Sequence, residues 1–312
     1  MEVKKKIVLY KEFGPLVAFS STCSLAIRYP IAISRWKDRC IIRWMKGQYG
    51  DIIQKYKQGD SCFLKGEKPI DSAPIWSVWW QGEQNVPEMV RMCFASVNRH
   101  RGNHPFIIVT KDNYQEYISL PEHILQKVNS GILRLTHFSD IIRLYLLSHY
   151  GGLWLDSTIY VADTIPEDIF SSKYYSIKPG FDPCSHAVTQ GRWSSFFQAA
   201  QKGSLLCSFA LDLQIAYWEK QMSLIDYVLI DYFYELAYEE LPSCRELLDS
   251  VPVNNPKVEG LRPLLNTAWG PSVLSELTAD TTFFKLTWKH IFKKTVFGRE
   301  TVYGHLVKDI VN

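Results

Sequence analysis

Residues 151 and 152 are both glycine, and they stand between two segments with different hydrophobic patterns. Residues 139–150 carry apolar side chains at helical spacing, and Ser139 is placed to cap a helix that must stop at the glycines. The apolar run 153–155 follows at once and is predicted to form a strand. It ends in Asp-Ser-Thr at 156–158, so a carboxylate and two hydroxyls are expected at a strand end, where open α/β sheets bind ligands.

Short apolar runs alternate with amphipathic segments on both sides of this break, which is typical of βαβ units. Strands are predicted at 75–80 and 106–110, and helices at 87–99 and 121–127. Further along, two helices rich in aromatic residues are predicted at 205–222 and 223–241, with aromatic rings that are more often core than ligand contacts. The last quarter of the chain, from residue 252, is predicted to be rich in loops.

Positive charge gathers at the start of the chain. Residues 1–47 hold ten Lys and Arg against three Asp and Glu, although the whole chain has a net charge of only +3. A helix at 33–46 would place basic residues on one side, namely Arg35, Arg39, Arg43 and Lys46. Its apolar side is expected to pack on its own domain, and contact of residues 1–47 with an anionic membrane surface is the alternative. No motif that reads nucleic acid follows, so a nucleic-acid partner is not expected.

Targeting signals are not evident in the sequence. The apolar stretch 13–27 is diluted by serines and threonine and meets Arg28 and Pro30, so neither a signal peptide nor a membrane span is predicted there. Seven cysteines at irregular spacing, without a C-x-x-C pair, indicate neither a disulfide framework nor a zinc cage. A cytoplasmic location, with an option of peripheral binding at the inner face of the membrane, is therefore expected.

Asp140 and Arg143 lie three residues apart and share one face near the start of the predicted helix. A carboxylate can accept hydrogen bonds from sugar or ribose hydroxyls, and a guanidinium can reach phosphate or sugar oxygens. An ordinary surface ion pair is the alternative interpretation. The strand-end carboxylate of Asp156, brought close by the glycine break, favours a ligand site.

Residues 137–158, HFSDIIRLYLLSHYGGLWLDST, resemble the S-D-x-x-R…Y-G-G-x-Y-x-D-x-D block of family 32 glycosyltransferases, and most closely the capsular polysaccharide synthesis subgroup. Supporting segments extend the likeness over most of residues 70–290; they are 75–82, 191–197, 230–233 and 285–287. The resemblance implies an α/β fold of the GT-A type, a Rossmann-like mixed sheet flanked by helices, which we expect at 71–312. The charge and helical pattern described above predict a basic, mainly helical extension at 1–70. It implies transfer of a sugar, with retention at the anomeric carbon, from a nucleotide-sugar donor to a glycan or lipid-linked glycan acceptor.

The same resemblance assigns roles to particular residues. Asp140, Arg143 and Asp156 would be catalytic. The donor-binding residues would be Trp79, Trp80, Ser139, Gly151, Gly152, Ser157 and Thr158. Arg192 and Trp193 could face the acceptor, although a core Trp beside a surface Arg is the simpler interpretation of that pair.

The family's metal motif has a second Asp where this chain has Thr158. Mg²⁺ and Mn²⁺ prefer oxygen ligands, usually with one or two carboxylates. A bound Mn²⁺ or Mg²⁺ would depend on Asp156, with Thr158, Asp231 and His305 as candidate partners, or basic side chains would replace the ion in part. The same substitution motivates an alternative function, a catalytically silent nucleotide-sugar-binding or scaffold protein of a polysaccharide assembly pathway.

Overall fold

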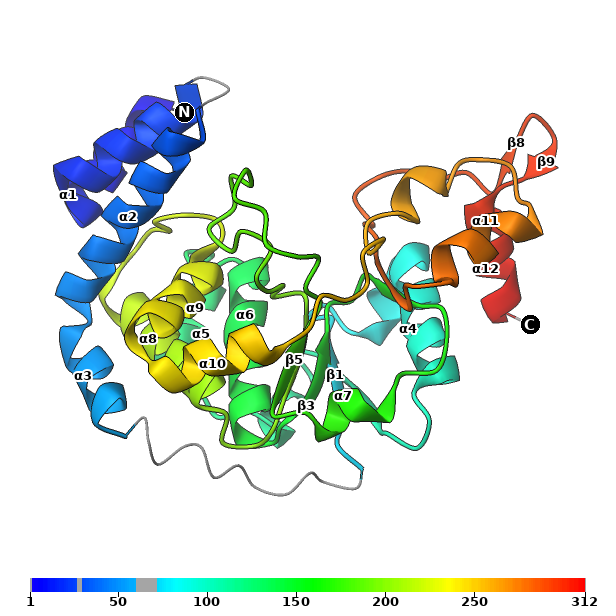
Figure 1. Cartoon of the computed structure of the whole chain (residues 1–312), viewed down its shortest axis with the longest axis horizontal. Helices are drawn as coiled ribbons and strands as arrows, with labels where there is room; N and C mark the ends of the chain where they lie inside the picture. The colour runs from blue at the N-terminus through cyan, green and yellow to red at the C-terminus, as the bar shows by residue number, and fades with distance from the viewer. Residues whose placement is uncertain (1, 27–29, 60–71, 312) are drawn as a thin grey trace.

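The computed structural model of the chain describes residues 2–26, 30–59 and 72–311. The predicted boundary at residue 70, between the N-terminal extension and the main domain, lies outside these residues. Figure 1 shows a layered molecule, with helices on both sides of a central sheet, the N-terminal helices at one end and the C-terminal segment at the other.

The central sheet has five strands in the order β2-β1-β3-β6-β5. Their bounds are β1 Ile75–Val78, β2 Phe106–Val109, β3 Gly152–Leu155, β5 Tyr174–Ser176 and β6 Phe197–Ala200. Strand β1 pairs in parallel with both β2 and β3, whereas β6 runs antiparallel to β3 and β5. The mixed sheet flanked by helices is thus confirmed, and the carboxyl ends of β1, β2 and β3 meet at one edge.

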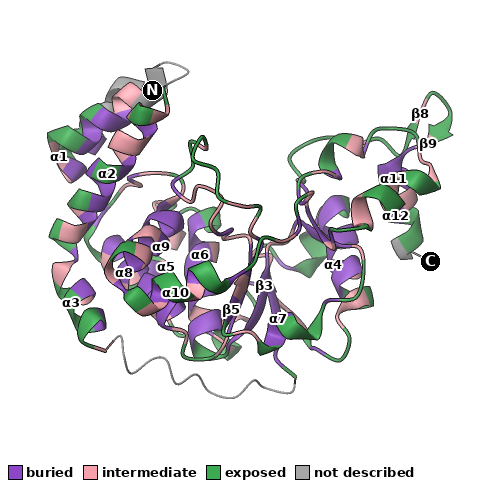
Figure 2. Ribbon diagram, viewed as in Figure 1, coloured by how far each residue is buried: buried purple, intermediate pink, exposed green. Residues whose placement is uncertain are grey.

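Helices cover both faces of this sheet (Figure 1). On one side lie α4 Glu88–His100 and α7 Glu167–Ser171. On the other side lie α5 Glu122–Asn129, α6 Leu135–His149, α8 Leu205–Lys220, α9 Leu229–Glu240 and α10 Pro242–Ser250. Successive residues of a strand point to opposite faces of the sheet, and each face has its own hydrophobic core. In β1, Ile75 belongs to the core that contains Val97 of α4, whereas Trp76 belongs to the core that contains Phe138 of α6. Figure 2 shows this burial concentrated at the sheet and the helix faces turned toward it.

Two predicted element boundaries are wrong. Helix α6 begins at Leu135, and Ser139 lies inside it, where its hydroxyl donates to the Thr136 carbonyl over 2.6 Å instead of capping the first turn. Between α8 and α9 the chain leaves the helix at residues 221–228, because the Tyr217 hydroxyl donates to the Ser223 carbonyl and accepts from the Ile225 amide, at 2.7 and 2.8 Å. These bonds satisfy backbone groups that a continuous helix would have paired internally.

The last quarter of the chain is more ordered than a loop-rich segment. Its elements are the 3-10 turn η4 Arg262–Leu264, α11 Pro271–Thr278, β7 Phe283–Lys285, β8 Thr295–Val296, β9 Arg299–Glu300 and α12 Val302–Val311. Strand β7 pairs antiparallel with β4 Ile159–Val161, which follows closely after β3. The C-terminal segment is therefore anchored beside the carboxyl end of β3.

Three N-terminal helices pack against the main domain: α1 Glu2–Ala26, α2 Ile31–Gln48 and α3 Gly50–Gly59. Helix α2 lies on α9, and α3 lies on α8. Ile41 and Met45 of α2 are fully buried, and Lys46 pairs with Glu239 and Glu240 of α9 at 2.6 and 2.5 Å. The expectation that the apolar side of this helix packs on its own domain is confirmed. None of the helices in the described residues is both long enough and apolar enough to cross a bilayer.

Gly152 stands where β3 makes its closest approach to the segment before β1. Its φ is 98°, and a Cβ atom built there would lie 2.2 Å from the Pro74 carbonyl oxygen. That carbonyl accepts a hydrogen bond from the Leu153 amide at 2.9 Å. Glycine is therefore required here by both backbone angle and space.

We expect Gly152→Ala to destabilise the fold by about 3 kcal/mol or more, because the added methyl group meets backbone and the positive φ is strained. Gly203→Ala is the matched control: its φ is 77°, but a Cβ atom there meets nothing within 4 Å, so its cost should stay near about 1 kcal/mol. Urea unfolding of both variants and the wild type measures the difference. Equal costs would contradict the steric argument.

Candidate active site

A pocket of 460 Å³ opens at the carboxyl edge of the sheet, between the ends of β1 and β3. The chain leaves β1 through α4 on one face and reaches β3 through α5 and α6 on the other, so the connections diverge at this point. Such a switch in strand order is where open α/β sheets bind ligands. Trp79 and Trp80 follow β1 and line the pocket, as do Asp156, Ser157 and Thr158 after β3.

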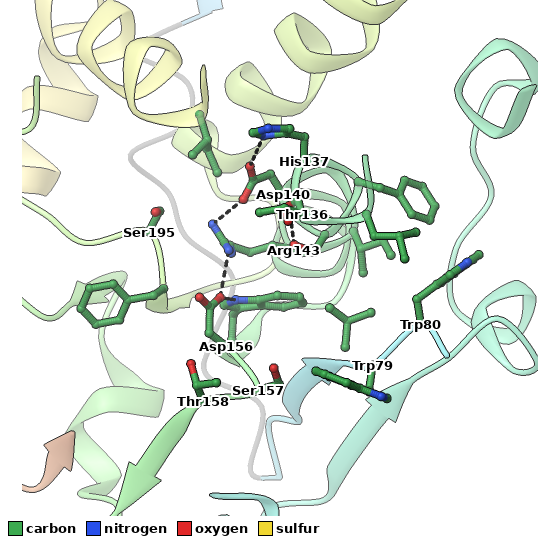
Figure 3. Close-up of a pocket in the computed structure, with 18 of the residues that line it drawn as sticks. Trp79, Trp80, Thr136, His137, Asp140, Arg143, Asp156, Ser157, Thr158 and Ser195 are labelled. Atoms are coloured by element: carbon green, nitrogen blue, oxygen red, sulfur yellow. Dashed lines mark hydrogen bonds and ion pairs between the residues drawn. The ribbon is translucent and has the colours of Figure 1, made fainter. Parts of the chain in front are cut away.

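Arg143 forms the floor of the pocket. It projects from α6 with only 3% of its side chain exposed, and its guanidinium contacts Asp140 at 3.1 Å and Asp156 at 3.0 Å. The guanidinium also lies over the Trp154 ring, 5.0 Å from its centre. Figure 3 shows this chain of contacts running from His137 through Asp140 and Arg143 to Asp156. The structure thus brings together the three residues predicted to be catalytic.

Lys285 joins the same carboxylate from a distant part of the chain. Its ammonium lies 2.6 Å from Oδ2 of Asp156, while Trp154 Nε1 donates to Oδ1 at 3.0 Å. Burial alone would raise the pKa of Asp156, but Lys285 and Arg143 outweigh it and hold that pKa below its ordinary value. Asp156 is therefore ionised at neutral pH. Sequence reasoning did not nominate Lys285, although the segment 285–287 was part of the family resemblance.

A second carboxyl group in the pocket has a different electrostatic environment. Asp231, in the first turn of α9, lines the pocket and accepts a hydrogen bond from Trp193 Nε1 at 3.1 Å. Burial raises the pKa of Asp231 to about 7, and the Trp193 hydrogen bond offsets only part of that effect. Asp156 is therefore firmly ionised, whereas Asp231 in the same pocket titrates near neutrality.

Aromatic rings form one side of the pocket mouth. Trp79 meets Trp288 edge-on with ring centres 5.8 Å apart, and Trp80 meets Phe138 with centres 4.9 Å apart. Trp288 is 46% exposed, so its ring offers apolar surface to solvent. In Figure 3 Trp79 and Trp80 lie across the pocket from Ser195. A flat ligand ring could stack against this side.

Several predicted site residues lie elsewhere. Gly151 and Gly152 are at the opposite end of β3 from Asp156, where they pack against backbone, and they do not line the pocket. Arg192 pairs with Glu235 and stacks on Tyr238, away from the pocket lining.

Two more predicted site residues have structural contacts. Trp193 is buried, and its indole Nε1 donates a hydrogen bond to the carboxyl group of Asp231. His305 stacks on Trp269 with ring centres 3.6 Å apart and lies 3.5 Å from Glu300, far along the chain in α12. Neither residue lines the pocket, whereas the remaining donor-site residues Ser139, Ser157 and Thr158 do.

The residues around Asp156 do not fit a Mg²⁺ or Mn²⁺ ion as they are arranged. Both carboxylate oxygens of Asp156 already accept from cationic groups, and Thr158 offers a hydroxyl without charge. No group of three or more His, Cys, Asp or Glu side chains in the described ranges is placed to hold a metal. Such ions usually need one or two carboxylates among about six oxygen ligands. The metal stays a prediction from the resemblance.

Comparison with known proteins finds partial similarity to glycosyltransferases. Over 99 residues the chain is 30% identical to the O-glycosyltransferase PaGT of Phomopsis amygdali, a match that covers 28% of this chain and 24% of that protein. The chain thus aligns with about a quarter of that relative's length. A solved structure, the PaToxG glycosyltransferase, aligns with 67% of this chain and 90% of its own at 13% identity and a TM-score of 0.39.

The α/β fold, the pocket at the strand ends and the partial likeness to PaGT define a glycosyltransferase-like protein. Residues 25–306 match the family model described as capsular polysaccharide synthesis protein, and the chain belongs to that family. The subgroup resemblance noted from the sequence is confirmed. The relationship to family 32 and its metal motif stays a prediction.

We expect Asp231→Asn to change how stability depends on pH. Because the pKa of Asp231 is raised to about 7 in the folded protein from its ordinary 3.8, its contribution is full below about pH 4 and is lost as pH rises through 7. The amide oxygen of the variant should still accept the Trp193 hydrogen bond. At pH 8 its free energy of unfolding should be higher than that of the wild type by on the order of a few kcal/mol.

Urea unfolding at pH 5 and pH 8 measures this difference. Asp51→Asn is the control, since it is the same substitution at an exposed position on α3, outside the pocket. If the free energy of unfolding depended on pH in the same way in the wild type and in Asp231→Asn, the raised pKa of Asp231 would be contradicted.

Proposed function

We propose that this protein transfers a sugar from a nucleotide-diphosphate donor to a glycan acceptor in the synthesis of a capsular or other surface polysaccharide. The observation that carries the proposal is the pairing of the buried Arg143 guanidinium with Asp140 and Asp156 at the carboxyl edge of the sheet. Membership of the capsular polysaccharide synthesis family and the partial likeness to an O-glycosyltransferase support it.

Unsatisfied donors in the pocket suit a polar ligand. Nε of Arg143 is buried without a hydrogen-bond partner, and Nη1 meets Asp140 as an ion pair but not in hydrogen-bond geometry. Leaving such donors unpaired costs free energy that a bound sugar or phosphate oxygen would recover. Asp140 and Asp156 would accept from sugar or ribose hydroxyls. The nucleobase would lie against Trp79 and Trp80, on the aromatic side.

A GT-A type domain and retention at the anomeric carbon belong to the same proposal. The carboxyl groups that line the pocket are Asp140, Asp156 and Asp231, and each is held by an ion pair or a hydrogen bond. This favours a reaction on one face of the sugar, in which the acceptor hydroxyl gives its proton to the departing diphosphate. Nuclear magnetic resonance of the first-formed glycoside distinguishes retention from inversion.

Contact with an anionic membrane surface, where a lipid-linked acceptor would lie, is supported by exposed groups on the N-terminal helices. Arg39 and Arg43 of α2 are exposed without a partner among the hydrogen bonds and ion pairs of the described residues. On the neighbouring α1, Tyr10 and Phe19 are 59% and 63% exposed. Cationic and aromatic side chains on adjacent helices suit a membrane interface.

Asp140→Asn and Arg143→Lys should each lower donor turnover about 100-fold, because each disturbs the group that positions the sugar while keeping the side chain nearly the same size. Hydrolysis of a panel of UDP- and GDP-sugars measures the loss, and thermal unfolding shows whether the variants fold. Arg99→Lys is the control, since Arg99 also pairs with an aspartate, Asp309, but this ion pair is solvent-exposed and lies outside the pocket.

A scaffold role predicts a different result in cells. If surface glycan is made normally by cells carrying Asp140→Asn or Arg143→Lys, while deletion of the gene abolishes it, transfer by this pocket is ruled out as its task. Glycan lost in both variants but retained with Arg99→Lys supports catalysis.

The double variant Arg39→Glu/Arg43→Glu should bind anionic vesicles at least tenfold more weakly than the wild type, since it replaces two exposed positive charges with negative ones. Co-sedimentation with phosphatidylglycerol-containing vesicles at low and high salt measures this, and wild-type binding should fall with salt. Lys294→Glu, an exposed site at the other end of the molecule, is the control. Equal binding of all three proteins would remove the membrane proposal.

A further inference from the structure

Lys285 stands at the point where a divalent cation would have to meet the strand-end carboxylate. Strand β7 pairs Lys285 with Ile159 of β4, and the Leu286 amide donates to the Thr158 carbonyl at 2.9 Å. These backbone bonds fix the start of the Lys285 side chain beside the 156–158 segment. The Lys285 side chain is 21% exposed and lines the pocket, and its ammonium reaches Asp156.

The carboxylate of Asp156 has little capacity left for a metal. A carboxylate offers about four acceptor positions, and Arg143, Trp154 and Lys285 occupy three of them. A Mg²⁺ or Mn²⁺ ion would have to displace the Lys285 ammonium from Asp156. At the second acidic position of the family's metal motif it would find only the hydroxyl of Thr158. The aromatic ring of Phe196, 5.1 Å from the ammonium, adds a favourable contact that the displaced lysine would lose.

The charges lining the pocket suit a diphosphate without added cations. Arg143, Lys285 and Lys289 are positive, whereas Asp140 and Asp156 are negative. A departing diphosphate therefore meets a pocket with net positive charge whenever the Asp231 carboxyl is protonated. Fixed positive groups aimed at developing negative charge are a large source of rate enhancement in enzymes.

We propose that the Lys285 ammonium, in place of a divalent cation, compensates the charge of the departing nucleoside diphosphate; this rests on the proposed sugar transfer. The bond between the anomeric carbon and the β-phosphate oxygen breaks, and its electron pair stays on that oxygen beside Lys285. The acceptor hydroxyl oxygen bonds to the anomeric carbon, and its proton passes to the diphosphate. Lysine keeps its own protons throughout.

Lys285→Met tests this assignment because it keeps the apolar stem and removes the charge. In EDTA the wild type should hydrolyse its preferred donor within about twofold of its rate in Mn²⁺, and Lys285→Met should lose about 100-fold in kcat. Lys294→Met is the matched control, a lysine of the same C-terminal segment that pairs with Glu88 outside the pocket. Wild-type turnover lost in EDTA and restored by Mn²⁺ or Mg²⁺, or a folded Lys285→Met that keeps full turnover, would overturn the proposal.

Binding provides a readout that is independent of turnover. In EDTA the wild type should bind uridine or guanosine diphosphate, and Lys285→Met should weaken that binding at least tenfold while leaving binding of the same nucleoside unchanged. A wild type that binds neither diphosphate and hydrolyses no donor, with or without Mn²⁺, would refute sugar transfer itself. Binding and turnover that both require a metal would refute the lysine role alone.

Restoring the second acidic residue gives a further test. The double variant Thr158→Asp/Lys285→Met has two carboxylates at the strand end and no competing ammonium, so Mn²⁺ should raise its turnover at least tenfold above that in EDTA. In the single variant Thr158→Asp, which keeps Lys285, Mn²⁺ should raise the turnover by a smaller factor. A folded double variant that ignores Mn²⁺ would contradict the idea that Lys285 occupies the position of the cation.

Discussion

The buried guanidinium of Arg143 is the interaction on which the rest of the pocket depends. A charge with only 3% of its side chain exposed is tolerable because carboxylates on both sides pair with it. One of these, Asp140, comes from its own helix, and the other, Asp156, comes from the end of β3. The ion pairs therefore join α6 to the sheet edge and fix the position of the carboxylate at the strand end.

Asp156 in turn links this pair to the end of the chain. Its second oxygen accepts from Lys285, which reaches the pocket only because β7 pairs with β4. A helix, a central strand and a C-terminal strand thus meet at one side chain. The pocket is complete only when the C-terminal segment has docked, so the stability of that small sheet and the geometry of the site are coupled.

The elements with strong local patterns could be predicted from the sequence, and the residues placed by long-range pairing could not. The spacing of Asp140 and Arg143, and the position of Asp156 after an apolar run, identified the core of the site. Strand β7 has three residues and no periodicity, and only its pairing with β4 brings Lys285 to the pocket. Gly152 was misassigned to the donor site because glycine serves tight backbone packing as well as ligand approach, and here Pro74 is the neighbour.

Replacing an ion by a lysine changes the electrostatic balance of such a site. A divalent cation brings two charges, whereas an ammonium brings one, so a pocket that depends on lysine must limit its negative charge. Burial of Asp231 has this effect, since it raises the pKa of that carboxyl to about 7 and leaves it largely neutral below that pH. Thr158 acts in the same direction, because a hydroxyl stands where the family's metal motif has a second acidic side chain. In the proposed reaction, Thr158 and the raised pKa of Asp231 thus both keep the negative charge around Lys285 low.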